Sequence, residues 1–264
     1  MPRRPCLLLL LLLLLGACER PAPSPAESSA LLLQRVKQGL AERDLRLRAY
    51  RFAGRVQAQG EAPLGFSFAY RAPGSMRGSL GPPASRTFAY DGEHLYEQHD
   101  GERRFTTYSF ALPAGTRAGF LTEIFSPFLP EGFRVPLLPQ AGVRAERTAH
   151  RLAAQAVRLT VPLPAEGEVQ YLLRWPTLDF LGKRARGAQG EAELRVEEEA
   201  CDAARGLCVP RKLTRWVAGR QVGETQLTEL TLDPDLPAEA FRLAAPAGYG
   251  AREQTLVAQE APAP

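Results

Sequence analysis

The sequence of 264 residues lacks the motifs that mark the common enzyme active sites. It contains no Gly-x-Ser-x-Gly, no His-Glu-x-x-His, no glycine-rich phosphate loop and no cysteine with a suitable histidine partner. Its three histidines, at positions 94, 99 and 150, do not stand at metal-ligand spacing with the cysteines. We therefore predict a protein that binds rather than catalyses, with no catalytic residue, no metal and no cofactor.

The sequence also lacks a strong excess of either charge. Its formal net charge of +4 falls to +2 if residues 1–17 are removed, because that segment contains Arg3 and Arg4 and no acidic residue. No cluster of lysine and arginine is interleaved with aromatic residues, as nucleic-acid binding would require. We expect no nucleic-acid partner.

The N-terminus has the pattern of an export signal. Two arginines precede nine leucines, Leu7 to Leu15, and this run is too short for the ~20 apolar residues of a transmembrane helix. Leu15-Gly16-Ala17-Cys18 resembles the bacterial lipobox, so we predict a lipoprotein signal peptide over residues 1–17 and acylation of Cys18 with chains such as palmitate. An ordinary export signal is the alternative.

The proline-rich residues 18–28 would then tether the protein to a membrane of the bacterial envelope without crossing it. We expect it to face the periplasm. Glu19 is not the aspartate associated with inner-membrane retention in enterobacteria, which favours the outer membrane.

Few cysteines remain after that processing. Cys6 leaves with the signal peptide and Cys18 carries lipid, so Cys201 and Cys208 are the only pair left. In an oxidising compartment we predict a structural disulfide between them, across the end of a hairpin.

The stretch from Phe66 to Tyr108 predicts an antiparallel meander of short strands. Phe66, Phe68 and Tyr70 alternate with small residues, which places the three rings on one face of a strand. Asp-Gly follows at positions 91 and 100, and this pair is typical of tight hairpin turns. The meander therefore has one apolar face that must be covered.

The rest of the chain continues this pattern with few helices. We expect an amphipathic helix from Ser28 or Ser29 to about Glu42, a long strand from Leu45 to Gly60, and further strands from Val143 to Leu232. Pro176–Gly187 is interpreted as a helical turn or an irregular crossing. Glu197-Glu198-Glu199 is interpreted as a solvated sheet edge, and residues 250–264 as a disordered tail.

One short apolar helix interrupts the strands. The large apolar residues between Gly115 and Leu129 recur at helical spacing. With roughly ten or eleven strands, a flat sheet would curl. We therefore predict a mostly β, α+β domain over residues 29–249, an incomplete antiparallel β-barrel with helices packed on its open side.

The order of these elements resembles the periplasmic lipoprotein-carrier family of the LolA and LolB type. The resemblance rests on Tyr70 to Gly74 with Met76-Arg77, on Tyr90 to Tyr96, and on Leu230 to Tyr249. It implies a half-barrel around a cavity for acyl chains. It also implies that Arg71 hydrogen-bonds to a lid and holds the cavity closed, and that Phe120 to Leu129 form part of that lid.

Two features depart from the family's pattern. The family's carrier is soluble, whereas Cys18 predicts an anchored protein, as in its acceptor member. The acceptor displays a large apolar residue on an exposed loop in this region, and Gly81 to Ser85 offers none.

We hypothesise that the chain binds, and transfers, lipids or the acyl chains of lipoproteins. For each residue of the predicted site, ordinary core packing is the alternative. The rival function is a structural or sensory envelope lipoprotein that binds a protein partner with the same fold. The predicted wall residues are Phe66, Phe68, Tyr70, Phe88 and Tyr90, and the predicted lid residues are Phe120, Leu121, Ile124, Phe125 and Phe128.

Overall fold

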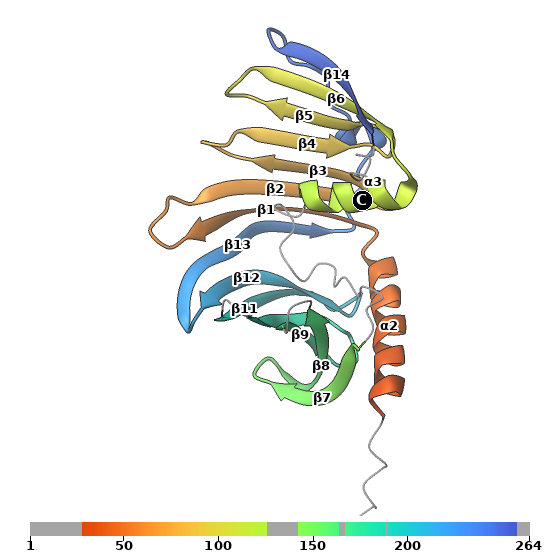
Figure 1. The fold of residues 1–264 in the computed structure, drawn as a ribbon, viewed down its shortest axis with the longest axis vertical. Coiled ribbons are helices and arrows are strands. Elements are labelled where there is room, and N and C mark those ends of the chain that lie inside the picture. The colour runs from red at the N-terminus through yellow and green to blue at the C-terminus, as the bar shows by residue number, and fades with distance from the viewer. Residues whose placement is uncertain (1–27, 126–141, 164–166, 188–189, 258–264) are drawn as a thin grey trace, which may run out of the picture.

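The computed structural model describes residues 28–125, 142–163, 167–187 and 190–257. These residues form one open sheet of fourteen strands in the order β14-β6-β5-β4-β3-β2-β1-β13-β12-β11-β10-β9-β8-β7 (Figure 1). All neighbouring strands are antiparallel except β14 and β6, which are parallel. Because the described sheet does not close, the predicted incomplete barrel is confirmed.

We divide the sheet between β1 and β13. The N-terminal half consists of β1 Ala49–Ala58, β2 Leu64–Arg71, β3 Ser75–Leu80, β4 Arg86–Tyr90, β5 Leu95–His99, β6 Arg104–Ala111 and β14 Gly250–Val257. The C-terminal half consists of β7 Arg144–His150, β8 Ala153–Leu163, β9 Gly167–Arg174, β10 Phe180–Gly187, β11 Gly190–Asp202, β12 Leu207–Val217 and β13 Arg220–Leu232.

The helix α2, Ser29–Arg46, packs on the C-terminal half. The Ser28 side chain accepts a hydrogen bond from the N–H of Leu31 and so caps the helix. Leu32, Val36 and Leu40 are buried in a cluster of aliphatic side chains, which we call the aliphatic cluster. The helix extends beyond the predicted end at Glu42, so the expected strand begins later, at Ala49.

The helix α3, Ala114–Phe125, crosses the N-terminal half near β2 and β3 (Figure 1). This helix confirms the predicted apolar helix as far as Phe125. The rest of the predicted segment, with Phe128, lies outside the described residues. Cys18 and the signal peptide also lie outside them. No helix in the described ranges is both long and apolar enough to cross a membrane.

Three sequence interpretations of the strands were wrong. Pro176–Gly187 contains strand β10, whose backbone pairs with β9 and β11, and this pairing is not visible in a pattern of apolar spacing. The Glu197–Glu199 run lies in β11, which pairs on both sides and is not an edge. Gly250–Val257 is strand β14, ordered by backbone pairing with β6 although most of its side chains are exposed.

The two Asp-Gly pairs do connect hairpins, but the turns are longer than the tight turns for which this pair is typical. Tyr90 pairs with Leu95, so four residues lie between β4 and β5. The Asp91 carboxylate accepts hydrogen bonds from the N–H groups of Glu93 and His94 and so orders this loop. The predicted disulfide is confirmed, since Cys201 and Cys208 are bonded at the tip of the β11–β12 hairpin.

Residues 233–249 run across the face of the N-terminal half that is opposite α3, and we call this segment the strap. It contains the short 3-10 helix η2, Ala238–Phe241, and the Phe241 side chain is fully buried. The Arg77 guanidinium donates to the carbonyl of Ala240, and the Tyr249 hydroxyl donates to Asp100. The N-terminal half is therefore covered by α3 on one face and by the strap on the other, whereas α2 packs on the C-terminal half.

Candidate ligand-binding face

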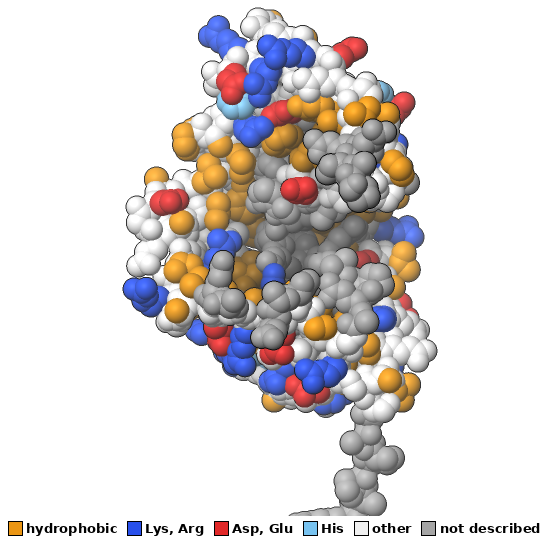
Figure 2. Space-filling model, viewed as in Figure 1, with side chains coloured by type: hydrophobic (Ala, Val, Ile, Leu, Met, Phe, Trp, Pro, Cys, Tyr) orange, Lys and Arg blue, Asp and Glu red, His pale blue; other side chains and the backbone are white. Residues whose placement is uncertain are grey.

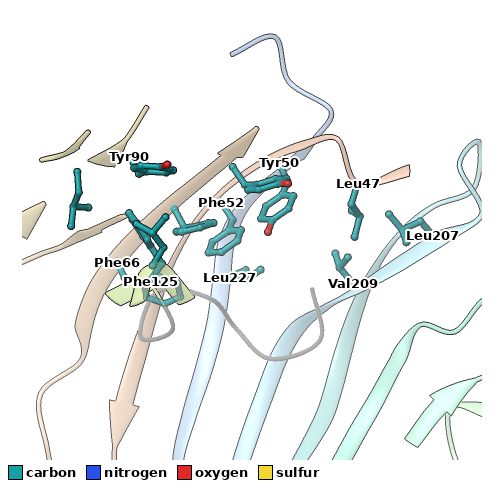
Figure 3. Close-up of a cluster of buried hydrophobic side chains, with 13 residues drawn as sticks. Leu47, Tyr50, Phe52, Phe66, Tyr90, Phe125, Leu207, Val209 and Leu227 are labelled. Carbon is teal, nitrogen blue, oxygen red and sulfur yellow. The ribbon is translucent and has the colours of Figure 1, made fainter. Parts of the chain in front are cut away.

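The face of the N-terminal half that carries α3 is lined by aromatic rings in register across two strands. Phe52 pairs with Phe68, and Tyr50 pairs with Tyr70, so the rings of β1 and β2 lie side by side. The ring centroids of Phe52 and Phe68 are 5.5 Å apart, and those of Tyr50 and Tyr70 are 5.1 Å apart. Figure 3 shows Tyr50, Phe52 and Phe66 in this group. We call this group and its neighbours the aromatic cluster.

Helix α3 contributes side chains to the aromatic cluster. Leu121 and Phe125 are buried, and the Phe125 ring meets Phe68 edge to face at 6.0 Å. Phe120 contacts Phe110 in the same geometry at 6.1 Å. Alternating strand residues and one helix face therefore bring together side chains that are far apart in the sequence.

The structure places every described member of the predicted wall and lid in this one cluster. Six are buried core members, and three are partly buried side chains that pack against them. The buried members are Phe66, Phe68, Tyr70, Tyr90, Leu121 and Phe125, and the partly buried ones are Phe88, Phe120 and Ile124. Sequence reasoning left out Tyr50 and Phe52, although their alternation in the first strand was a usable signal.

Open volume adjoins the aromatic cluster at the boundary between the two halves. A pocket of about 390 Å³ is lined by Leu230 and Leu232 of β13 and by the β11 end from Ala200 to Ala203. Leu230 pairs with Phe52, and Leu232 pairs with Tyr50, so the pocket is next to the rings. Figure 2 shows a hollow bordered by hydrophobic side chains in this view. A volume of this size is within the range of small-ligand sites.

Among the described residues, Arg71 contacts the strap and not α3, so these contacts do not support the lid-holding role that the resemblance implied for it. Arg71 follows Tyr70, and successive side chains of a strand point to opposite faces. Its guanidinium donates to the carbonyl of Leu236 at 2.9 Å and stacks over Phe241 at 5.3 Å. Arg71 therefore fastens the strap on the other side of the sheet.

A polar group interrupts the apolar face at one end. Glu97 is only 6% exposed, and its carboxylate accepts hydrogen bonds from Arg86 and, at 2.8 Å, from the hydroxyl of Tyr108. Burial by itself raises the pKa of Glu97, but the hydrogen bonds from Arg86 and Tyr108 and the nearby charge of Arg104 lower its pKa below the ordinary value. Glu97 therefore stays ionised at neutral pH.

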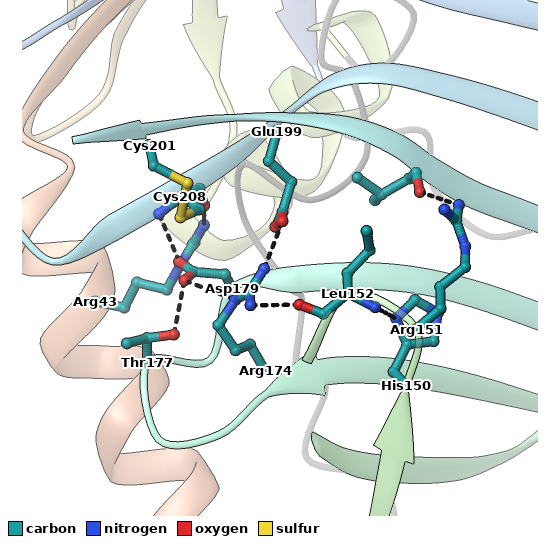
Figure 4. A network of polar contacts seen from close by, with 11 residues as sticks. Arg43, His150, Arg151, Leu152, Arg174, Thr177, Asp179, Glu199, Cys201 and Cys208 are labelled. Atoms are coloured by element: carbon teal, nitrogen blue, oxygen red, sulfur yellow. Dashed lines mark hydrogen bonds and ion pairs between the residues drawn. A yellow bond between two sulfur atoms is a disulfide. The ribbon is translucent and has the colours of Figure 1, made fainter. Parts of the chain in front are cut away.

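A second polar network joins α2 to the disulfide hairpin (Figure 4). Asp179, 1% exposed, lies 3.5 Å from the fully buried guanidinium of Arg43 and accepts the N–H of Cys208 at 3.0 Å. Arg174 pairs with Glu199 and donates to the carbonyl of Leu152. These contacts connect α2 with β9 to β12 and fix the C-terminal half.

No group of three or more potential metal ligands occurs within the part of the chain that the structure describes. The described face offers apolar contact, one buried carboxylate and two guanidinium groups.

Solved structures of similar architecture are known. A DUF1329 family protein from Desulfovibrio piger matches with a TM-score of 0.51 and 11% identity, over 80% of this chain and 97% of that chain. This match shows a shared fold. A LolA superfamily protein from Nitrosomonas europaea matches with a TM-score of 0.45 and 11% identity, over 83% of this chain and 99% of that chain.

A third match is the MucA/MucB complex of Pseudomonas aeruginosa, with a TM-score of 0.31 and 17% identity, over 80% of this chain and 60% of that chain. No protein-family model and no curated protein matches the sequence. At these identities the likeness is one of fold alone.

Proposed function

We propose that the protein binds acyl chains of lipids or lipoproteins on its aromatic face and acts in lipid or lipoprotein handling in the bacterial envelope. The observation that carries this proposal is the aromatic cluster. Nine predicted wall and lid residues from the strands β2 and β4 and the helix α3 converge on one face, next to a pocket of about 390 Å³.

The driving force is desolvation of the chain. Burying one CH₂ group is worth ~0.8 kcal/mol, so an acyl chain of about twelve carbons gains roughly 9 kcal/mol before ordering costs. No covalent step is required. The absence of catalytic motifs in the sequence agrees with a binding role, and we propose that the protein is not an enzyme.

Helix α3 controls access to the rings in this proposal. Leu121 and Phe125 occupy the space above Phe68, so an entering chain displaces them or extends from the pocket beside Leu230 and Leu232. The helix is well suited to move, because Gly115 and Gly119 lie within it and a Cβ at either would meet no atom within 4 Å. Glycine without a packing reason weakens a helix.

The anchor follows from the sequence. We propose that Cys18 is acylated and holds the domain at a membrane of the envelope, facing the periplasm, with the outer membrane favoured by Glu19.

A charge introduced on the aromatic face tests the proposal. Phe88→Glu places a carboxylate among the wall residues at a partly buried position, where the fold is expected to survive. We expect uptake of a fluorescent fatty acid by the purified protein to fall about tenfold or more, because the chain would have to desolvate that carboxylate. Native mass spectrometry of the wild-type protein identifies any lipid that co-purifies.

Leu194→Glu is the matched control. Leu194 is a partly buried residue that packs on the aliphatic cluster, so it offers the same change on the other half of the sheet. Fatty-acid uptake should stay within about twofold of wild type in this variant. Equal losses in both variants, or a wild-type protein that takes up no fatty acid and carries no lipid, would overturn the proposal.

A protein partner is the second candidate function. One observation favours it: each outer strand of the described sheet, β14 and β7, pairs with a neighbour on one side only. Such edges accept an added strand from a partner. Under this candidate, Phe88→Glu and Leu194→Glu leave partner binding unchanged, whereas proline substitutions in β14 weaken it.

A further inference from the structure

Basic side chains form a row at one end of the aromatic face. Arg86 pairs with His99, and His99 pairs with Arg104, so the three lie side by side on β4, β5 and β6. Arg86 precedes Phe88 by two residues and Tyr90 by four, and such residues share one face of a strand. The row therefore lies on the same face as the rings of the proposed acyl site.

The carboxylate within this row does not neutralise both guanidinium groups. Glu97 is hydrogen-bonded to Arg86 and Tyr108, and its Oε1 is 3.9 Å from Nη2 of Arg104. Arg104 has a second partner in Glu102, but the Glu102 side chain is 51% exposed in the turn that precedes β6. Close to the apolar face, two fixed positive charges thus share one buried negative charge.

The guanidinium of Arg86 is held in a fixed orientation and remains accessible. It lies 5.1 Å from the centroid of the Phe88 ring, and its side chain is 39% exposed, while that of Arg104 is 32% exposed. Stacking on a ring and pairing with a buried carboxylate pre-organise a guanidinium, which offers five N–H donors. Among the described residues, Glu97 accepts from only one of the nitrogen atoms of Arg86.

We propose that Arg86 and Arg104 bind the anionic headgroup of an amphiphile, either a carboxylate or a phosphate, while its chain lies on the aromatic cluster. This inference rests on the proposed acyl binding. Guanidinium groups make strong, directed hydrogen bonds to both kinds of oxyanion. Phe88 and Tyr90, next along β4 from Arg86, continue from the headgroup site into the rings. The row therefore gives the ligand a direction: the headgroup lies at the β3–β4 and β5–β6 turns, and the chain runs toward α3.

Three ligands with the same chain length and different headgroups test the inference: lauric acid, lauryl phosphate and lauryl alcohol. Their affinities for the purified protein are measured by displacement of a fluorescent fatty acid. We expect the acid and the phosphate to bind about tenfold more tightly than the alcohol. In Arg86→Gln/Arg104→Gln this preference disappears while the affinity for the alcohol is unchanged. Higher ionic strength should reduce the preference in the wild type only.

Two further variants exclude trivial causes. Arg51→Gln/Arg55→Gln removes the same charge from the opposite face of β1, where both residues are exposed, and should keep the preference. Removal of Arg86 leaves the buried carboxylate of Glu97 with the Tyr108 hydroxyl as a donor but without its guanidinium partner. If the double variant does not fold, Arg86→Gln/Glu97→Gln/Arg104→Gln removes the whole charged group, and it too should bind acid and alcohol equally.

Each other outcome contradicts the inference. Equal affinities of the wild type for acid and alcohol, or an undiminished preference in the Arg86→Gln/Arg104→Gln variant, would overturn the headgroup site and leave acyl binding intact. If inorganic phosphate or acetate alone binds as tightly as the laurate ligands, the row is a site for free anions. If none of the three ligands binds, the proposed function fails, and the headgroup site fails with it.

Discussion

The two halves of the sheet are covered by helices of opposite character. On the C-terminal half, α2 has eighteen residues, a capped start and three buried aliphatic residues at helical spacing. On the N-terminal half, α3 has twelve residues and contains two glycines with open space around them. A Cβ at Gly39 of α2 would instead lie 2.6 Å from the side chain of Leu178. Helix α2 is therefore tightly packed against the C-terminal half, whereas α3 is packed less tightly on the N-terminal half.

The outer faces differ in the same sense. The C-terminal half carries ion pairs on the side away from α2, such as Arg195 with Glu193 at 2.7 Å and Arg186 with Glu191 at 2.9 Å. The N-terminal half is covered on its other face by the strap, whose own Phe241 side chain is buried. Because the strap and Arg71 support this half from behind, α3 is not required to hold its strands together. A helix can move without unfolding the sheet beneath it only if other contacts, here those of the strap on the opposite face, stabilise that sheet.

The largest expected effect comes from removing the buried Arg43–Asp179 ion pair of the C-terminal half. Asp179→Asn removes the carboxylate that faces the fully buried Arg43, and an uncompensated buried charge costs about 3–5 kcal/mol. We expect equilibrium urea unfolding to show a loss of that size. Glu146→Gln, which removes an exposed ion pair with Arg158, should cost less than about 1 kcal/mol. Similar losses in the two variants would contradict the rigid role of the Arg43–Asp179 pair.

A smaller effect separates the two helices directly. Leu32→Ala in α2 should cost about 3 kcal/mol, because the site cannot collapse around the cavity. Leu121→Ala in α3 should cost about 1–2 kcal/mol, since α3 can detach without unfolding the sheet. Amide hydrogen exchange should rise across β7 to β12 in the first variant and within α3 alone in the second. Exchange that rises throughout the chain for Leu121→Ala would refute independent movement of α3.

The smallest expected effect comes from a substitution that stabilises α3 rather than weakening it. Gly119→Ala adds a Cβ that meets nothing and should stabilise α3 by about 0.5–1 kcal/mol. A more stable closed helix should slow fatty-acid uptake several-fold in stopped-flow measurements. Gly39→Ala provides the contrast, because its Cβ displaces Leu178 and should lower the stability of the protein. An unchanged uptake rate for Gly119→Ala would show that α3 does not limit entry.

Much of the fold could be predicted because alternation and helical spacing are local signals. Phe66, Phe68 and Tyr70 revealed their shared face, and Phe120 to Phe125 revealed a helix. The same signals failed for β10, which is ordered by backbone pairing with β9 and β11. They failed also for β14, whose partner β6 is distant in sequence and whose own side chains are mostly exposed. A pattern of side chains does not report which backbone groups find partners.

The candidate site was predicted in its apolar part and missed in its polar part. Aromatic residues are expected on the inner face of a curved sheet, so the wall and lid residues followed from periodicity. The Arg86–Glu97–Arg104 group requires the register of three strands before it can be recognised as one site. For Arg71, the resemblance implied a hydrogen bond to the lid. The described hydrogen bond is to the strap, on the opposite face of the sheet, because successive side chains of a strand point to opposite faces.

The placement of the chain ends has a mechanical consequence. The helix α2 begins beside β7, where the N–H of Ala145 donates to the Ser29 side chain, and β14 lies at the opposite edge of the sheet. A pull on the N-terminus is therefore carried by α2 and the aliphatic cluster. The aromatic face is outside that line of force. Tension at the proposed anchor would leave the ligand-binding half unstrained, so the protein can be held at a membrane without its site being opened by its own tether.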